Sequence, residues 1–226
     1  MSVRKEQLAE NVTVFCADNR DVLPVLGRFD AVVMDPPYGL GDLWQGGAAA
    51  SQSRWKLADG GAGCRWDSEA PDLSLALACG GHQIVWGGHL FGLPPARGWL
   101  VWNKIIRNWS SGECELAWTN LDQPIRAFDC SHGQLATEGK VHPTQKPLGL
   151  MLWCLAQLPR KANSVCDPFR GSGSTGVACV REGKSFVGIE AEPRYFDIAC
   201  RRISDELRRP RLFAEPVAKP VQEALL

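Results

Sequence analysis

Short apolar runs, separated by polar or helical segments, recur along this chain of 226 residues. Such runs, when turn residues bound them, are typical of buried strands. The expected strands are Val12–Cys16, Phe29–Met34, Gln83–Trp86, Trp99–Trp102, Glu115–Thr119, Ile125–Phe128, Val165–Asp167 and Ser185–Ile189. The expected helices are Asp72–Cys79, Leu148–Leu158, Ser174–Glu182 and Pro193–Arg209. Strands that alternate with helices predict an α/β fold whose mostly parallel sheet is covered on both faces.

Two long segments interrupt this alternation. Residues 39–66 are rich in glycine, alanine and serine, and residues 103–141 combine two short strands with loops. Loops of this length within a compact domain are usually functional or disordered. We therefore expect a single domain over residues 1–209, with both segments contacting a partner. Residues 210–226 contain three prolines and are expected to form a flexible tail.

Composition narrows the class of protein. The 25 basic and 25 acidic residues cancel, so contact with nucleic acid would need a local basic patch. No run approaches the roughly 20 apolar residues of a membrane span, and the first residues lack a signal-peptide core. The nine cysteines are odd in number and lack metal-ligand spacing. We expect a cytoplasmic protein without a metal site or a membrane partner.

The first motif with a chemical interpretation is Asp35-Pro36-Pro37-Tyr38, directly after the expected strand Phe29–Met34. Open α/β sheets place their chemistry at the carboxyl ends of strands. The two prolines fix φ and remove two backbone donors, so the corner is stiff and its carbonyls point outward. A carboxylate, a carbonyl and an aromatic ring on such a corner could hold an exocyclic amine and stack on its base. An ordinary turn stays open for the tetrapeptide alone.

The second motif spans residues 167–176, Asp-Pro-Phe-Arg-Gly-Ser-Gly-Ser-Thr-Gly, between an expected strand and an expected helix. Its glycines would let a ligand approach the backbone, and the helix start offers free amides. The next strand ends at Glu190, which is well placed to accept hydrogen bonds from ribose hydroxyls. The pattern predicts half of a site for an adenosine-containing cofactor. Glu190 could instead only precede the helix that starts at Pro193.

A third cluster, residues 142–147 with the sequence His-Pro-Thr-Gln-Lys-Pro, precedes the expected helix Leu148–Leu158. Alone it is best interpreted as a helix start with Thr144 as its cap. Together, the three motifs resemble the amino-group DNA methyltransferases, which use S-adenosylmethionine to methylate adenine or cytosine amines. The catalytic motif precedes the cofactor glycines, which resembles the circularly permuted β group. The resemblance covers most of residues 12–203.

This resemblance implies a Rossmann-like methyltransferase fold with a seven-stranded, mostly parallel sheet, one antiparallel strand and a small target-recognition insert. Val12–Cys16 and Phe29–Met34 would be its third and fourth strands. Val165–Asp167 and Ser185–Ile189 would be its first and second strands. The helix Pro193–Arg209 would then end near Val12–Cys16, which makes the permuted chain order tolerable.

The resemblance also implies roles. Asp35 and the carbonyl of Pro36, in the catalytic motif with Pro37, would accept hydrogen bonds from the target amine, and Tyr38 would stack on the base. Thr144 and Lys146 would close over the methionine carboxylate. The whole set of implied cofactor contacts is Asp18, His142, Thr144, Lys146, Asp167, Phe169, Gly171, Ser172, Gly173, Ser174, Thr175 and Glu190. The candidate DNA phosphate contacts are Arg54, Lys56, Arg65, Lys104, Arg107 and Arg126.

The expected reaction is direct methyl transfer to a flipped-out base in double-stranded DNA. A covalent intermediate is not expected, because ring-carbon methylation needs a nucleophilic cysteine and no Pro-Cys pair occurs. Aspartate at position 35 favours adenine N6 over cytosine N4 in this family. Arg170 stands where the family usually has an apolar residue, so a DNA-binding relative without activity stays open. A nicotinamide-dependent oxidoreductase, methylation of RNA or protein glutamine, a homodimer and a restriction endonuclease partner also stay open.

Overall fold

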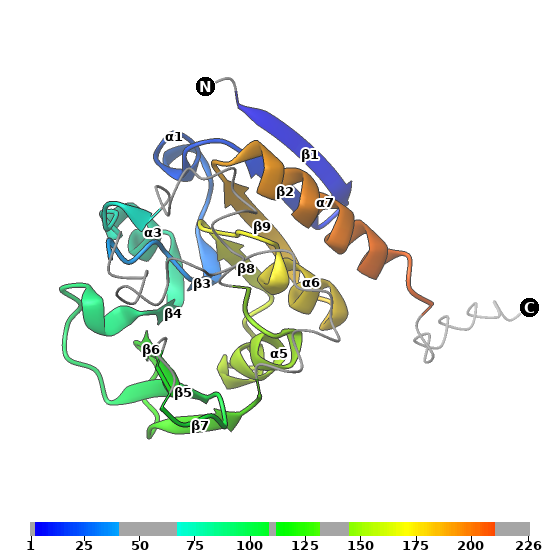
Figure 1. Ribbon diagram of the computed structural model, residues 1–226. Helices are drawn as coiled ribbons and strands as arrows, with labels where there is room; N and C mark the ends of the chain where they lie inside the picture. The colour runs from blue at the N-terminus through cyan, green and yellow to red at the C-terminus, as the bar shows by residue number, and fades with distance from the viewer. Residues whose placement is uncertain (1–2, 41–66, 109–111, 132–144, 211–226) are drawn as a thin grey trace, which may run out of the picture.

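The computed structural model describes residues 3–40, 67–108, 112–131 and 145–210 (Figure 1). Within these residues, nine strands form one sheet in the order β1-β2-β9-β8-β3-β4-β6-β5-β7. Their bounds are β1 (Arg4–Ala9), β2 (Val12–Cys16), β3 (Phe29–Met34), β4 (Gly80–Trp86), β5 (Gly98–Asn103), β6 (Cys114–Thr119), β7 (Arg126–Asp129), β8 (Ser164–Asp167) and β9 (Ser185–Glu190).

The centre of the sheet is parallel, as the alternation of strands and helices predicted. Strands β2, β9, β8, β3 and β4 run in one direction. β6 runs antiparallel between β4 and β5, and β7 pairs parallel with β5. The four strands that the resemblance assigned lie side by side in the order β2-β9-β8-β3.

The expected number of seven strands and the single antiparallel strand were wrong. The described part of the sheet has nine strands, and both β1 and β6 run antiparallel to their neighbours. β1 was missed because its sequence, Arg-Lys-Glu-Gln-Leu-Ala, is mostly polar. An edge strand exposes much of its surface and needs no apolar run, so hydrophobic pattern alone does not find it.

Helices cover both faces of the sheet (Figure 1). They are α1 (Asn19–Val22), α3 (Ser74–Ala78), α5 (Leu148–Gln157), α6 (Ser174–Arg181) and α7 (Pro193–Leu207), with 3-10 turns at η1 (Leu23–Val25) and η5 (Gly88–Leu90). Along β3, Ala31 and Val33 join the core under α5, α6 and α7, whereas Val32 and Met34 join the core under α1 and α3. This alternation is what a strand buried on both faces requires.

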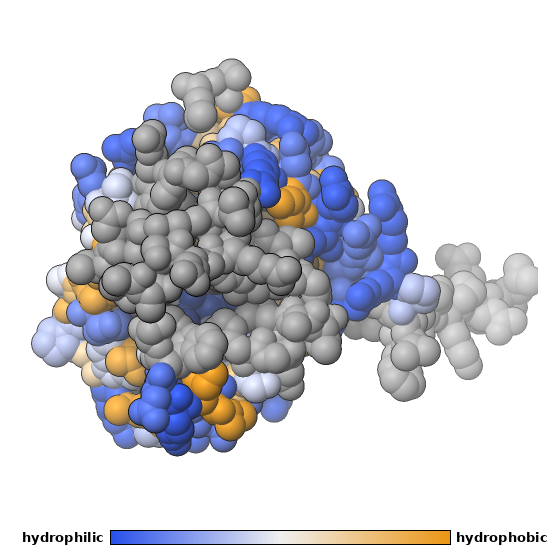
Figure 2. Space-filling view, in the orientation of Figure 1, coloured by the Kyte–Doolittle hydropathy of each residue, from blue (hydrophilic) through white to orange (hydrophobic). Residues whose placement is uncertain are grey.

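The helix α7 packs against β1 and β2, so elements from the two ends of the chain are neighbours (Figure 1). Phe196, Ala199 and Ile203 form its buried side, at the helical spacing that the sequence predicted. Its outward side is hydrophilic, as Figure 2 shows. None of the helices in the described residues combines the length and the apolar character needed to cross a membrane.

Candidate active site at the carboxyl ends of the strands

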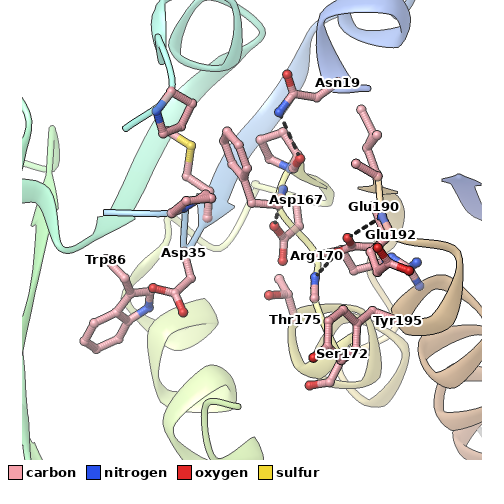
Figure 3. Close-up of a pocket in the computed structure, with 18 of the residues that line it drawn as sticks. Asn19, Asp35, Trp86, Asp167, Arg170, Ser172, Thr175, Glu190, Glu192 and Tyr195 are labelled. Atoms are coloured by element: carbon pink, nitrogen blue, oxygen red, sulfur yellow. Dashed lines mark hydrogen bonds between the residues drawn. The ribbon is translucent and has the colours of Figure 1, made fainter. Parts of the chain in front are cut away.

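A cavity of about 1000 Å³ lies at the carboxyl ends of β3, β8 and β9. Asp35 and Trp86 lie on one side of it, and the loop from Asp167 to Thr175 lies on the other with Glu190 (Figure 3). The first two motifs are far apart in the sequence, but β3 and β8 are paired neighbours. The sheet order therefore brings both motifs to one cavity, where open parallel sheets bind ligands.

The glycine loop between β8 and α6 depends on two left-handed residues. Gly171 has φ of +53° and Gly173 has φ of +84°, which side chains rarely allow. A Cβ on Gly173 would lie 2.7 Å from the Cβ of Ala199 in α7. A Cβ on Gly171 would meet nothing within 4 Å. Gly173 therefore lets the loop pack on α7, whereas Gly171 leaves open space beside the cavity.

Glu190, at the end of β9, is held by two backbone amides. Its Oε2 accepts a hydrogen bond from the amide of Gly171 at 2.8 Å, and its Oε1 accepts one from Glu192 at 2.9 Å. Burial raises the pKa of Glu190. Each carboxylate oxygen keeps a further acceptor site. The geometry fits a carboxylate that is oriented by the protein and still able to accept hydrogen bonds from a ligand.

Asp167, at the end of β8, is 3 % exposed. Burial raises its pKa to about 7, although the Thr175 hydroxyl and the Phe169 amide both stabilise the charged form. The Phe169 amide donates to Oδ1 at 3.1 Å. This group is therefore poised between its neutral and its charged form near neutral pH.

Asp18 and Asn19 connect β2 to the same cavity. Asp18 caps α1 by accepting from the amide of Arg20 at 2.9 Å, and it pairs with the Arg20 guanidinium at 2.6 Å. Asn19 donates through Nδ2 to the carbonyl of Pro168 at 3.2 Å. That hydrogen bond, which the sequence did not reveal, ties α1 to the start of the glycine loop.

On the opposite wall, Asp35 is the centre of a hydrogen-bonded group. The Tyr38 hydroxyl donates to Oδ1 of Asp35 at 2.7 Å, and Nζ of Lys146 donates to Oδ2 at 2.6 Å. Lys146 also contacts Oε2 of Glu115 at 2.9 Å, and Lys104 contacts Oε1 of Glu115 at 3.0 Å. Burial raises the pKa of Asp35, while Lys146 opposes this shift.

The ring of Tyr38 packs against neighbouring residues and does not line the cavity. It lies so close to Gly87 that a Cβ there would come within 2.2 Å of it, and it meets Phe91 edge-on with ring centroids 6.5 Å apart. The fully buried carboxylate of Asp67 accepts hydrogen bonds from the amides of Tyr38 and the next two residues. The loop that follows β3 is therefore held at both its side chains and its backbone.

Several expected site residues do not line the cavity or lie outside the described part. Pro37 lines it, but Pro36 and Gly173 do not. The remaining cofactor residues within the described part do line it: Asp18, Lys146, Asp167, Phe169, Gly171, Ser172, Ser174, Thr175 and Glu190. The expected residues outside the described residues are His142, Thr144, Arg54, Lys56 and Arg65.

Three of the basic residues that were expected to contact DNA phosphates lie in the described part: Lys104, Arg107 and Arg126. For Lys104 the structure corrects this expectation. Lys104 is 2 % exposed and pairs with Glu115, so it does not present its charge to DNA phosphates. Arg107 is exposed and pairs with Glu113 at 3.1 Å. Arg126 is exposed on the edge strand β7. Hydrophobic pattern could not separate these cases, because burial of a lysine depends on partners from other strands.

Arg170 belongs to the glycine loop and is buried. Its guanidinium lies 5.3 Å from the ring centroid of Phe196 in α7, and none of its nitrogens has a hydrogen-bond partner among the described residues. A Cβ on Gly188 would come within 2.4 Å of its Cδ, so this glycine provides room for the side chain. Burial lowers the pKa of Arg170. The charged end is accommodated between β9 and α7.

Comparison with known proteins shows what this part of the chain is similar to. Residues 92–201 match the family model described as DNA methylase, of the N6_N4_Mtase type. This part of the chain, just under half of its length, is therefore similar to DNA methylases of the N6/N4 type. The matched region includes Lys146, the glycine loop and Glu190, and it begins after Asp35.

Relatives and solved structures agree with this assignment. The Type II methyltransferase M2.MboI of Moraxella bovis is 44% identical over 66 residues, which are 29% of this chain and 24% of that protein. The match therefore spans about a quarter of the relative's length. The protein in the crystal structure of the M1.HpyAVI-SAM complex is 21% identical in sequence, and the two structures superpose with a TM-score of 0.55. The match covers 84% of this chain and 99% of that chain. The cytosine-N4-specific PvuII DNA methyltransferase is 15% identical in sequence, with a TM-score of 0.55, and the match covers 91% of this chain and 89% of that chain. The fold is thus the Rossmann-like one of DNA methyltransferases.

The cavity and its surroundings contain site residues that the sequence did not single out. Trp86 ends β4 beside Asp35, and Glu115 lies on β6 next to both lysines. Trp86 could have been found from its place at the carboxyl end of a strand. Asp67 and Asn19 carried no such signal, because each acts by hydrogen bonds to backbone that is distant in sequence. Among the described residues, no group of three metal-ligating side chains could hold a metal ion.

Proposed function

We propose that this protein transfers a methyl group from S-adenosylmethionine to the exocyclic N6 amine of adenine in double-stranded DNA. The observation that carries the proposal is that Asp35 and the glycine loop form opposite walls of one cavity. A cofactor on the loop would then face an amine held at Asp35. Cytosine has a similar amine at N4, and analysis of the methylated nucleosides separates the two bases.

The residues present suit the cofactor. The open side of Gly171 leaves room for a ligand close to the backbone, and Glu190 and Asp18 supply acidic groups on the same side of the cavity. When bound, S-adenosylmethionine supplies an electrophilic methyl group on a positively charged sulfur. Asp167 contributes an acidic group that is buried close to the loop. A ribose, an amine and a sulfonium are each compatible with this acidic wall.

Asp35 would act on the base. Two of the roughly four acceptor sites of its carboxylate are used by Tyr38 and Lys146, which leaves sites for the protons of the target amine. A hydrogen bond to the amine localises the nitrogen lone pair and aims it at the methyl group. Because burial raises the pKa of Asp35, its carboxylate is also suited to accept the proton that the methylated nitrogen must lose.

The base must leave the double helix to reach this cavity. In our proposal, the loops 39–66 and 103–141, with Arg107 and Arg126, contact the DNA around the flipped base. Tyr38 would have to turn away from Gly87 to stack on the base. A domain over residues 1–209, a cytoplasmic location, a homodimer and an endonuclease partner remain predictions.

The test uses unmethylated genomic DNA and S-adenosylmethionine with a tritiated methyl group. Wild-type protein is expected to transfer tritium to DNA, and mass spectrometry of nucleosides is expected to show N6-methyladenine. The Asp35→Asn variant should lose at least about 100-fold in kcat, because a neutral amide lacks the negative charge of the carboxylate and cannot take up the proton that the methylated nitrogen loses. Its Kd for S-adenosylmethionine, measured by calorimetry, should stay within about threefold.

Asp122→Asn is the matched control, because Asp122 is an exposed carboxylate that pairs with Arg97 at 2.8 Å and does not line the cavity. It should retain wild-type turnover. Wild-type turnover in a folded Asp35→Asn variant would contradict the catalytic assignment. N4-methylcytosine as the sole product would keep the mechanism and replace adenine as the substrate.

A further inference from the structure

Lys146 joins two carboxylates in the wall of the cavity. Its Nζ lies 2.6 Å from Oδ2 of Asp35 and 2.9 Å from Oε2 of Glu115. The lysine side chain is 6 % exposed, and those of Asp35 and Glu115 are 22 % and 23 % exposed. Contacts this short between poorly exposed charges are strong compared with surface ion pairs, because little water screens them.

Four separate segments supply this group of charges. Asp35 follows β3, Lys146 precedes α5, Glu115 lies on β6 and Lys104 follows β5. The second lysine, Lys104, contacts the other oxygen of Glu115 at 3.0 Å. The row Asp35, Lys146, Glu115 and Lys104 therefore alternates in sign and sums to zero charge. Neutral overall charge makes such a row tolerable at this depth.

Aromatic rings fix the two ammonium groups from the side. Nζ of Lys146 lies 5.3 Å from the ring centroid of Trp86, and Nζ of Lys104 lies 5.4 Å from that of Trp102. Both indoles are almost fully buried. Cation–π contact of this kind stabilises a desolvated ammonium. Lys146 thus contacts two carboxylates and one ring, and Lys104 contacts one carboxylate and one ring.

The charge states are consistent with this geometry. Burial opposes the charge of Lys146, yet Asp35 and Glu115 raise its pKa well above the ordinary value for a lysine. Burial likewise opposes ionisation of Glu115, but Lys146 and Lys104 lower its pKa to about 2. Lys146 is thus a permanent cation beside Asp35 over the whole physiological pH range.

We propose that Lys146 is a positioning residue for Asp35: anchored by Glu115, it fixes the Asp35 side chain and keeps it ionised so that it can accept the target amine. This inference rests on the proposed function. The resemblance alone had placed Lys146 on the methionine carboxylate of the cofactor. In the structure, two of its three ammonium protons are directed to Asp35 and Glu115, and Lys146 also lines the cavity.

The charged and titratable groups around Asp35 set the expected pH behaviour. Lys146 lowers the pKa of Asp35, whereas burial and Glu115 raise it, and Tyr38 donates a hydrogen bond to it. Lys104 lies beyond Glu115, and Asp167 lies across the cavity. Removing the lysine should therefore raise the pKa of Asp35, and removing the Glu115 charge should lower it.

The first experiment measures kcat against pH for Lys146→Met. The acid limb, where Asp35 must lose its proton, should move to higher pH by at least about one unit, and kcat at neutral pH should fall about 100-fold. The Kd for S-adenosylmethionine should stay within about threefold. The variant Lys146→Arg keeps the charge and should restore the position of the acid limb.

Glu115→Gln gives an opposite signature. Its acid limb should move to lower pH, while kcat falls about tenfold because Lys146 loses its anchor. A purely structural role would shift the limb in neither direction. Lys184→Met is the control, because Lys184 donates to the carbonyl of Ala162 at 2.6 Å and does not line the cavity. It should leave the pH profile unchanged.

A second readout needs no catalysis. Carbon-13 NMR titration of the Asp35 carboxyl, assigned by its loss in Asp35→Asn, should show a higher pKa in Lys146→Met than in wild type. If wild-type protein transfers no methyl group, the proposed function fails, but this titration still tests the pairing. Where Lys146→Met does not fold, Lys146→Arg, Glu115→Gln and the charge-balanced Lys146→Met/Glu115→Gln supply the same comparisons.

Two results would overturn the proposal. An unchanged kcat–pH profile and Asp35 titration in a folded Lys146→Met variant would show that the lysine does not act on Asp35. A Kd for S-adenosylmethionine raised tenfold or more, with kcat intact, would make Lys146 a cofactor ligand as the resemblance implies.

Discussion

Two aspartates show how burial decides the behaviour of the same side chain. Asp30, at the start of β3, is exposed, and hydrogen bonds from Ser164 and Asn163 lower its pKa. Asp167, at the end of β8, is buried, and its pKa rises to about 7. Between about pH 4 and 7 the unfolded chain would ionise position 167 while the folded protein keeps the proton. The stability from Asp167 is therefore present at low pH and lost as pH rises through 7.

Asp167→Asn removes this titration. The free energy of unfolding of this variant minus that of wild type should be about 2 kcal/mol larger at pH 8 than at pH 5, since one pKa unit corresponds to roughly 1.4 kcal/mol. Urea unfolding at both values measures the difference. Asp30→Asn should show no change between these two pH values, because the stability from its lowered pKa is lost only as pH falls below about 4. A pH-independent difference for Asp167→Asn would contradict the raised pKa.

At the scale of elements, the site depends on how closely the glycine loop and α6 approach α7. Gly173→Ala would place a Cβ 2.7 Å from the Cβ of Ala199 and force an alanine to φ of +84°. We expect a loss of about 2–4 kcal/mol in the free energy of unfolding and weaker binding of S-adenosylmethionine. Gly183→Ala isolates the backbone cost, because φ there is +71° and nothing lies within 4 Å. Its free energy of unfolding, measured by chemical denaturation, should be about 1–2 kcal/mol lower than that of wild type. Equal losses would show that the contact with α7 carries no strain.

At the scale of the whole molecule, the cavity joins segments from distant parts of the chain, Ala17–Arg20 and Met34–Pro37 on the early side and Asp167–Thr175 on the late side. A ligand that binds only the folded protein stabilises it by mass action. S-adenosylmethionine at about 100 times its Kd should add about 2.7 kcal/mol to the free energy of unfolding, visible as a raised Tm. NAD at the same concentration should leave Tm unchanged. Stabilisation by NAD instead would favour the oxidoreductase that the glycine motif alone left open.

Sequence by itself determined most of the strands and helices and the strand ends that carry the candidate site residues. Apolar runs located eight of the nine described strands, and the helical spacing of Phe196, Ala199 and Ile203 located α7. The strand ends pointed to Asp35, Asp167 and Glu190, because the periodicity of buried positions is local. The polar edge strand β1 escaped this signal.

Only the tertiary structure decided which charges meet. Burial of Lys104, the pairing of Lys146 with Asp35 and the packing of Tyr38 against Gly87 each need segments that are distant in sequence. Whether a lysine faces solvent, a cofactor or a carboxylate depends on the order of the strands and on the side chains that neighbouring strands present. That order is set by burial of the whole core, and no local pattern encodes it.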